Sequence, residues 1–295
     1  MEHTKGKDMF LVIGATGNIG KHVVAELSSR GLPVRVVSRD IQHARQVLPE
    51  TVEYMQANLT QEPDVQAALH GVSKIYLATN GPDQLVAETN VINAARNAGV
   101  QHVVRVSVIG ATPDHFVAIA RAHHQLDQLL AESGIPATTL RPNWFMENFF
   151  GSADSIVHQG AIYGSADDGR VAFIDSRDTA AVAVRVLTED GHAGKDYHLT
   201  GPEALTFAEA AQRLSEGSGH SVTYINLSDS DFRGALVGAG VPEVFADLYL
   251  QINRNARENN LAVVSNTIEA VTGLPARSLA VFTRDNAAAF TPVKA

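Results

Sequence analysis

Phe10-Leu-Val-Ile-Gly-Ala-Thr-Gly-Asn-Ile-Gly20 is the stretch that decides the fold of this 295-residue chain. Its apolar first half is typical of a buried strand, its three glycines are spaced three apart, and a helical pattern follows at once. A strand, a glycine turn and a helix in this order bring backbone N–H groups and a positive helix end to a pyrophosphate. The stretch therefore predicts a dinucleotide site, and a tight turn without a ligand is the alternative. The expected ligand-binding residues of the turn are Gly14, Thr16, Gly17, Asn18, Ile19 and Gly20.

Strand-like and helix-like patterns alternate from this turn to Pro142, which indicates a parallel sheet with helices on both faces. We expect an α/β fold, namely a Rossmann-type doubly wound parallel sheet with a smaller, interleaved C-terminal α/β substrate subdomain. The predicted strands are Met9–Ile13, Val34–Val37, Val52–Met55, Lys74–Thr79, His102–Ser107 and Ala137–Leu140. The predicted helices are Asn18–Arg30, one that begins at Asp40 as its N-cap, Glu62–His70, Asp83–Ala98 and Phe116–Ser133.

The alternation loosens after Pro142, which suggests that a second subdomain begins there. We expect the dinucleotide-binding domain to cover residues 1–145, with 172–190 returning to it, and the substrate side to cover 146–295. The predicted elements of this part are a helix at Asn143–Gln159, strands at Ala161–Tyr163 and Val171–Ile174, a helix at Asp178–Thr188, a strand at Lys195–Leu199, a helix with a capping box at Thr206–Gly217, and a strand at Val222–Ile225.

Composition and charge exclude several classes of function. The formal net charge is −9, from 23 Lys and Arg against 32 Asp and Glu, so no basic surface favours nucleic acid. The absence of cysteine excludes disulfides, thiol catalysis and Cys-ligated metal. No apolar run approaches the roughly 20 residues of a membrane helix. We therefore expect a cytoplasmic protein with no nucleic-acid partner, no membrane span and no metal.

The end of the second predicted strand bears on the choice of nucleotide. An acidic residue there binds the ribose 2′-hydroxyl of NAD, whereas Arg accommodates the 2′-phosphate of NADP. Ser38 and Arg39 offer a donor and a fixed positive fork, while Asp40 would favour NAD unless it caps the next helix. NADP(H) is thus expected over NAD(H). Further cofactor contacts are expected where other strands end, at Asn58, Leu59, Ala78, Thr79, Asn80 and Ser107.

The usual acid of short-chain dehydrogenases is missing from this chain. Those enzymes protonate the substrate oxygen with a Tyr held in Tyr-x-x-x-Lys. None of the six tyrosines here has Lys four residues later. A carbonyl reduction that depends on this acid is therefore not expected.

Three motifs together carry a family resemblance, and they are Gly14-Ala-Thr-Gly-Asn-Ile-Gly20, Leu140-Arg-Pro-Asn-Trp-Phe-Met-Glu-Asn148 and Tyr197-His-Leu-Thr-Gly-Pro202. With them the chain resembles the NmrA-like branch of the atypical short-chain dehydrogenases/reductases, from about Met9 to Ala289. That branch includes NADPH-dependent quinone reductases, triphenylmethane dye reductases and redox-sensing regulators without activity. The segment Gly240-Val-Pro-Glu243 looks most like the dye and quinone reductases. By this resemblance, Pro142 and Asn143 join the cofactor-binding residues.

The resemblance also points to a pair on the helix after the fifth strand. In this branch that helix carries His and Glu four residues apart, and the matching positions are His123 and Asp127. Residues four apart share a helix face, so the carboxylate would orient the imidazole and favour its charged form. A surface pair without functional consequence is the alternative.

The aromatic residues after the sixth strand suggest where an acceptor binds. Trp144, Phe145 and Phe149 would stack on a flat, apolar molecule, and a plain subdomain core is the alternative. We expect an NADPH-dependent reductase that passes hydride to a quinone or a conjugated dye-like compound. The alternative is a non-catalytic NADP(H)-binding redox sensor that regulates a protein partner. A small aromatic acceptor is the expected partner, and a protein partner or a homodimer stays open.

Overall fold

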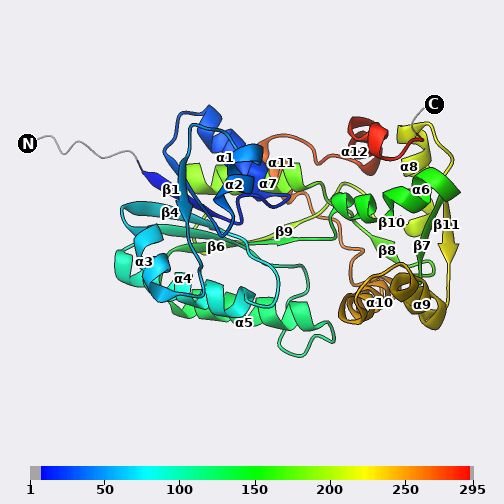
Figure 1. The fold of residues 1–295 in the computed structure, drawn as a ribbon, viewed down its shortest axis with the longest axis horizontal. Coiled ribbons are helices and arrows are strands. Elements are labelled where there is room, and N and C mark those ends of the chain that lie inside the picture. The colour runs from blue at the N-terminus through cyan, green and yellow to red at the C-terminus, as the bar shows by residue number, and fades with distance from the viewer. Residues whose placement is uncertain (1–7, 293–295) are drawn as a thin grey trace, which may run out of the picture. The chain divides into compact units, whose positions relative to one another are not determined.

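The computed structural model describes residues 8–292, and its central feature is a seven-stranded sheet (Figure 1). The strand order is β3-β2-β1-β4-β5-β6-β9. The strands are β1 (Met9–Ile13), β2 (Val34–Ser38), β3 (Glu53–Gln56), β4 (Val72–Leu77), β5 (His102–Val106), β6 (Ala137–Pro142) and β9 (Asp196–Leu199). This is the predicted Rossmann-type α/β sheet.

The pairs from β3 to β6 are all parallel, with β1 between β2 and β4. The last pair, β6 with β9, is also parallel. Thr139 N–H donates to Lys195 O and Asn143 N–H donates to Leu199 O, so residue numbers increase together along the two strands. The direction in which successive strands are added to the sheet reverses next to β1. Strands β2 and β3 lie on one side of β1, whereas β4 and the later strands lie on the other. Open α/β sheets bind their ligands at such a switch point, at the carboxyl ends of the strands.

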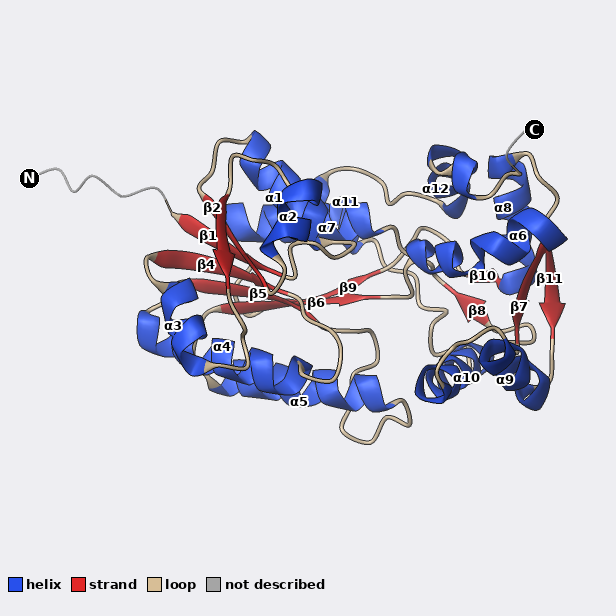
Figure 2. Ribbon diagram, in the orientation of Figure 1, coloured by secondary structure: helices blue, strands red, loops and turns tan. Residues whose placement is uncertain are grey.

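Helices cover both faces of this sheet, with α3, α4 and α5 on one face and α1, α2 and α7 on the other (Figure 2). Their bounds are α1 (Gly20–Ser29), α2 (Ile41–Val47), α3 (Glu62–Leu69), α4 (Gln84–Ala98), α5 (Ala118–Glu132) and α7 (Ser176–Thr188). Alternate strand residues such as Ile75 and Leu77 pack on the first group of helices. The opposite face includes Lys74, whose Nζ donates to Leu187 O at the end of α7.

Helix ends follow the sequence signals. Asp40 caps α2, because its carboxylate accepts from His43 N–H at 2.9 Å. Gly99 ends α4 in the left-handed region, at φ +69°. The predicted capping box is confirmed, since Thr206 and Glu209 exchange both bonds at the start of α8 (Phe207–Ser218).

Further elements form two small sheets and several helices. β7 (Ala161–Gly164) pairs in parallel with β11 (Thr223–Asn226), and β8 (Arg170–Val171) pairs antiparallel with β10 (Leu205–Thr206). The accompanying helices are the 3-10 turns η1 (Met146–Ser152) and η2 (Ala287–Ala289), with α6 (Ala153–Gln159), α9 (Asp229–Gly238), α10 (Glu243–Arg257), α11 (Thr267–Thr272) and α12 (Leu279–Asp285).

Some expected elements differ from those observed. The helix expected at Asn143–Gln159 begins only at Met146, and its first part is a 3-10 turn. Pro142 and an extended Phe145 keep the preceding backbone out of the helix, because Phe145 bridges to Ile174. The strand expected at Val171–Ile174 is shortened to β8, and β10 was not predicted.

The described residues divide into two compact units. One contains the chain up to Pro113, then Ile119–Arg141 and Thr179–Tyr197, and it carries most of the seven-stranded sheet. The other contains Asp114–Ala118, Pro142–Asp178 and the chain from His198 onward. In the described part of the chain, no helix has the length and apolar character needed to cross a membrane.

Candidate functional site

The glycine turn packs too closely for side chains at two of its three glycines. A Cβ on Gly14 would lie 1.9 Å from Ala78 O, and Gly14 has φ +79°. A Cβ on Gly20 would lie 2.1 Å from Gly14 O. Gly17 differs, because its Cβ would meet only Gly14 O, at 3.3 Å. Gly14 and Gly20 therefore hold strand β1, the end of β4 and helix α1 together, whereas Gly17 is exposed.

The start of α1 has backbone donors that the helical ladder does not use. Gly17 N–H donates to Gly14 O at 3.1 Å, and the helical ladder begins with Lys21, His22 and Val23. Ile19 is the N-cap residue, and no side chain caps it. The amides between Gly17 and Lys21 are thus left for an anion at the positive end of α1. This is the arrangement that a dinucleotide pyrophosphate needs, so the residues present fit the cofactor.

The end of β2 carries an exposed guanidinium, on Arg39, and a carboxylate, on Asp40, that caps the next helix. The Asp40 carboxylate is engaged in capping α2, and Ser38 Oγ donates to Asp40 O at 2.9 Å. Arg39 is largely exposed, and its nearest acid is Asp83, with 3.7 Å between Nη1 and Oδ2. With the Asp40 carboxylate engaged in capping α2, Arg39 is the exposed charged side chain directly after β2.

The other expected cofactor residues lie as follows. Asn58 Oδ1 accepts from Thr60 N–H and Oγ1–H, and Leu59 packs partly into the core under α3 and α4. Asn80 is exposed next to the half-buried Ala78. Asn143 is buried, where its Nδ2 donates to Leu261 O and its Oδ1 accepts from Trp144 N–H. Because both ends of that side chain are engaged, its position favours a structural role for Asn143 beside the buried Pro142.

A buried charge cluster lies under the carboxyl ends of β4 and β5. It consists of Glu88, Arg105, Asp127 and Arg141. Arg105 is fully buried, its Nε donates to Glu88 Oε2 at 2.6 Å, and its Nη1 donates to Asp127 Oδ1. Arg141 Nη1 donates to Asp127 Oδ2 at 2.7 Å. Arg141 Nε also donates to both carboxylate oxygens of Asp196, at 2.7 Å, so each guanidinium is paired with two carboxylates, as buried ions require.

Two residues at the strand ends join this cluster. Thr79 Oγ1 donates to Glu88 Oε1 at 2.7 Å, and Ser107 Oγ donates to Asp127 Oδ2 at 2.8 Å. The hydroxyl hydrogens of Thr79 and Ser107 are therefore directed into the protein. Neither hydroxyl can therefore donate to a ligand, and Ser107 N–H is also engaged, because it donates to Leu140 O at 2.7 Å.

His123 lies against Arg105, not against Asp127 as expected. Arg105 Nη2 lies 3.1 Å from His123 Nδ1. The carboxylate of Asp127 is taken up by Arg105, Arg141 and Ser107. Asp127 therefore reaches the imidazole only through Arg105.

The expectation that the imidazole of His123 is charged is wrong. Burial, followed by the positive charges of Arg105 and Arg141, lowers the pKa of His123 to about 3. The expectation failed because it placed a carboxylate beside the ring, where the fold places a guanidinium. The sequence signal that was missed is Arg105 itself, a charged residue in the otherwise apolar strand Val103-Val-Arg-Val106.

The aromatic residues after β6 have different environments. Phe149 is buried, with its ring centroid 5.2 Å from that of Phe173, which favours the core alternative. Trp144 packs edge-on to Phe207 at 5.5 Å but stays half-buried, as does Phe145. Accessible aromatic surface thus remains at Trp144 and Phe145.

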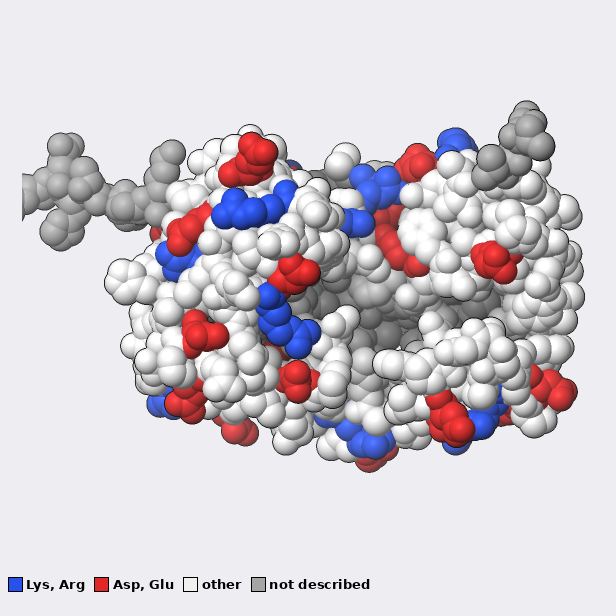
Figure 3. All heavy atoms as spheres, in the orientation of Figure 1, with Lys and Arg blue, Asp and Glu red and all other residues white. Residues whose placement is uncertain are grey.

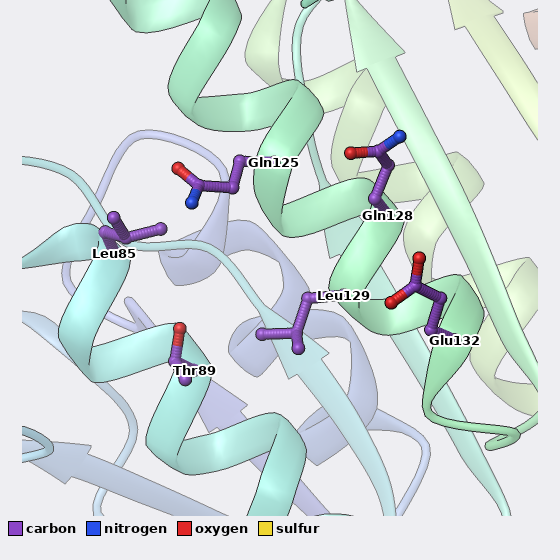
Figure 4. Close-up of a pocket in the computed structure, with 6 residues that line it drawn as sticks. All are labelled: Leu85, Thr89, Gln125, Gln128, Leu129 and Glu132. Atoms are coloured by element: carbon purple, nitrogen blue, oxygen red, sulfur yellow. The ribbon is translucent and has the colours of Figure 1, made fainter.

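Two surface features contribute no further site. On the face drawn in Figure 3, acidic and basic side chains are interspersed, with no extended basic area. A shallow groove lies between α4 and α5, where Leu129 faces Leu85 and Thr89 (Figure 4). Its other lining residues are Gln125, Gln128 and Glu132, and among the described residues no group of acids and histidines could hold a metal ion.

Comparison with known proteins agrees with this geometry. A family model described as NAD(P)H-binding matches residues 14–190. The chain is 39% identical over 283 residues to an NAD(P)H azoreductase of Xenophilus azovorans, covering 96% of this chain and 99% of the other. It superimposes on the NADPH-dependent quinone oxidoreductase of Escherichia coli complexed with NADPH, with a TM-score of 0.86 and 33% sequence identity. That match covers 94% of this chain and 99% of the other. It also superimposes on the triphenylmethane reductase of Citrobacter sp. complexed with NADP(H), with a TM-score of 0.85 and 30% sequence identity. That match covers 94% of this chain and 99% of the other.

The sheet, the glycine turn and the donors at α1 define a dinucleotide-binding oxidoreductase fold. The chain belongs to the NAD(P)H-binding family, in its NmrA-like atypical short-chain dehydrogenase/reductase branch.

Proposed function

We propose that this protein is an NADPH-dependent reductase of apolar, electron-poor acceptors, namely quinones or conjugated dye-like compounds. The observation that carries the proposal is the open row of amides at the start of α1, with exposed Arg39 at the end of β2. The amides would hold the pyrophosphate, and Arg39 would hold the 2′-phosphate. Bound NADPH would supply the hydride.

The preference for NADP(H) over NAD(H) rests on the residues at the end of β2. Asp40 is engaged as a helix cap and does not face a ribose as a free acid. Arg39 can form a forked pair with a phosphate, which Lys or Ser would not match. The remaining cofactor contacts that we propose are the backbone groups of Ala78, Thr79, Asn80 and Ser107, with Asn58 and Leu59 toward the adenine.

The acceptor class follows from what the chain lacks and what its relatives use. No tyrosine has the Lys partner that would make it a dedicated proton donor. A quinone that accepts hydride becomes a stabilised anion, and a cationic dye becomes neutral, so neither needs such an acid. Azo compounds, quinones and triphenylmethane dyes appear in the names of the relatives. Trp144 and Phe145 are the rings that we propose stack on the acceptor.

The decisive experiment combines binding with turnover. The purified protein is titrated with NADPH and NADH, and then a panel of quinones and dyes is added while nicotinamide absorbance is followed at ~340 nm. Turnover with a preference for NADPH supports the proposal. Tight binding without oxidation of NADPH, together with a co-purifying protein, would instead favour the redox sensor.

A further inference from the structure

The tautomer of His123 can be derived from its neighbour. A guanidinium group only donates hydrogen bonds, so His123 Nδ1, 3.1 Å from Arg105 Nη2, must accept. The single proton of the neutral ring then resides on Nε2. In the imidazolium form, an Nδ1–H would point at the guanidinium N–H groups, so this contact excludes it.

The charges around His123 lead to the same conclusion independently. The groups that face it are Arg105 from β5, Arg141 from β6 and Asp127 from its own helix, with Glu88 from α4 behind Arg105. Arg141 is also paired with Asp196, at 2.7 Å, so all of these carboxylates are bonded to guanidinium groups and none is bonded to the ring. A proton added to His123 would be a buried positive charge without a partner, beside two guanidinium groups.

The second ring nitrogen stays accessible. In the described part of the chain, the buried side-chain atoms without a partner belong to Tyr76, Ser165, Thr179 and Gln251, and His123 is not among them. Since only Nδ1 is bonded and the residue is 6% exposed, Nε2–H has contact with solvent. The cluster behind the ring also bonds Thr79 and Ser107, which follow β4 and β5 at the carboxyl ends of the strands, where open α/β sheets bind ligands.

We propose that Arg105 is a positioning residue that holds His123 neutral, with its proton on Nε2, so that His123 offers the acceptor a hydrogen bond rather than a proton. This inference rests on the proposed reductase function. A quinone that gains a hydride carries a negative charge on one oxygen, and Nε2–H stabilises that oxygen as a fixed donor. The proton that completes the hydroquinone comes from water, so His123 ends the cycle in the state in which it began.

The first test reads the tautomer directly and needs no turnover. Long-range ¹H–¹⁵N spectra of histidine-labelled protein with NADP⁺ bound are recorded from pH 5 to 8, and His123→Gln identifies the resonance. We expect Nδ1 unprotonated, Nε2 protonated and no titration of His123 in this range. A proton on Nδ1, or a titration midpoint near 6.5, would overturn the inference.

Two variants separate the role of Arg105 from that of Asp127. Asp127→Asn should leave the Nε2–H tautomer in place, because Arg105 still donates to Nδ1. Arg105→Lys should no longer fix the Nε2–H tautomer of His123, so the spectra should show both tautomers of this ring or its titration. If Arg105→Lys does not fold, Asp127→Asn still tests the proposal. Loss of the Nε2–H tautomer of His123 in Asp127→Asn would make Asp127 the orienting residue and contradict the proposal.

The kinetic test distinguishes this inference from the proposed function. With a quinone at saturating NADPH, kcat should show no ionisation from pH 6 to 8, and His123→Ala should lower kcat by about tenfold to a hundredfold at unchanged NADPH affinity. His123→Gln, which keeps an N–H donor, should restore most of the loss. A kcat that falls above pH 6.5 would refute the donor role while leaving the reductase intact. No turnover with any acceptor would refute the reductase, while the tautomer result would stand.

Discussion

The carboxylate of Asp40 accepts a hydrogen bond from His43 N–H at 2.9 Å, which commits the acid at the end of β2 to capping α2. Asp40→Ala should therefore lower the free energy of unfolding by about 1 kcal/mol without changing the ratio of NADPH to NADH affinity. Denaturant unfolding and cofactor titration measure the two effects. Asp40→Asn keeps a capping group and serves as the control. A selective loss of NADH affinity in Asp40→Asn would show that the carboxylate binds the ribose instead.

Arg39 should carry the preference for the phosphorylated cofactor. Arg39→Gln removes a charged, forked donor, which corresponds to roughly a tenfold to hundredfold loss of NADPH affinity. NADH affinity should be nearly unchanged, because NADH has no 2′-phosphate. Fluorescence titration with each cofactor measures both constants. Arg30→Gln, at the far end of α1, is the control and should alter neither, and an equal loss for both cofactors in Arg39→Gln would contradict the assignment.

Asp83 lies 3.7 Å from Arg39 and should oppose the binding of a phosphate. Asp83→Asn removes a negative charge near that phosphate and frees Arg39 from its exposed partner. Since exposed pairs contribute about 0.2–1 kcal/mol, NADPH should bind up to about fivefold more tightly. Repeating the titration at high salt should shrink the difference between variant and parent. The same gain for NADH would show that the effect does not involve the 2′-phosphate.

Gly17 should matter for the cofactor more than for the fold. A Cβ there meets only Gly14 O at 3.3 Å, so Gly17→Ala should fold, but the added methyl group would occupy the closest approach to the pyrophosphate. We expect at least about tenfold weaker binding of both cofactors with a thermal midpoint near that of the parent. Gly20→Ala is the contrasting variant, because its Cβ would lie 2.1 Å from Gly14 O and should destabilise the fold itself. Unchanged cofactor affinity in Gly17→Ala would place the pyrophosphate elsewhere.

Acid should destabilise the protein through its buried histidines. Burial, followed by the nearby Lys74 and His192, lowers the pKa of His102 to about 4. Between pH 6.5 and 4 the unfolded chain binds this proton and the folded chain does not, so the free energy of unfolding falls as pH falls through this window. His102 should contribute a slope of up to about 1.4 kcal/mol per pH unit. His102→Gln should reduce the slope in denaturant unfolding at several pH values, whereas the exposed control His43→Gln should not.

Most strands and helices and the glycine turn were predictable because each depends on residues close together in the sequence. The glycines of the turn and the Asp40 cap are such local signals, and they lie as expected. The buried charge cluster was not predictable in the same way, since it joins Glu88, Arg105 and Arg141 from three separate elements. The spacing of His123 and Asp127 placed both on one helix, but only the fold brings Arg105 to the ring.

The edge strand β9 is supplied by Asp196–Leu199, and Lys195 and Leu199 provide carbonyl partners for the backbone of Thr139 and Asn143. A chain emerging from the ribosome therefore cannot complete its nucleotide-binding sheet until it has been translated through Leu199. Until then the backbone of β6 is an open edge on which another nascent chain can pair. The order of the strands along the chain thus leaves β6 an unpaired sheet edge throughout the part of synthesis that precedes β9.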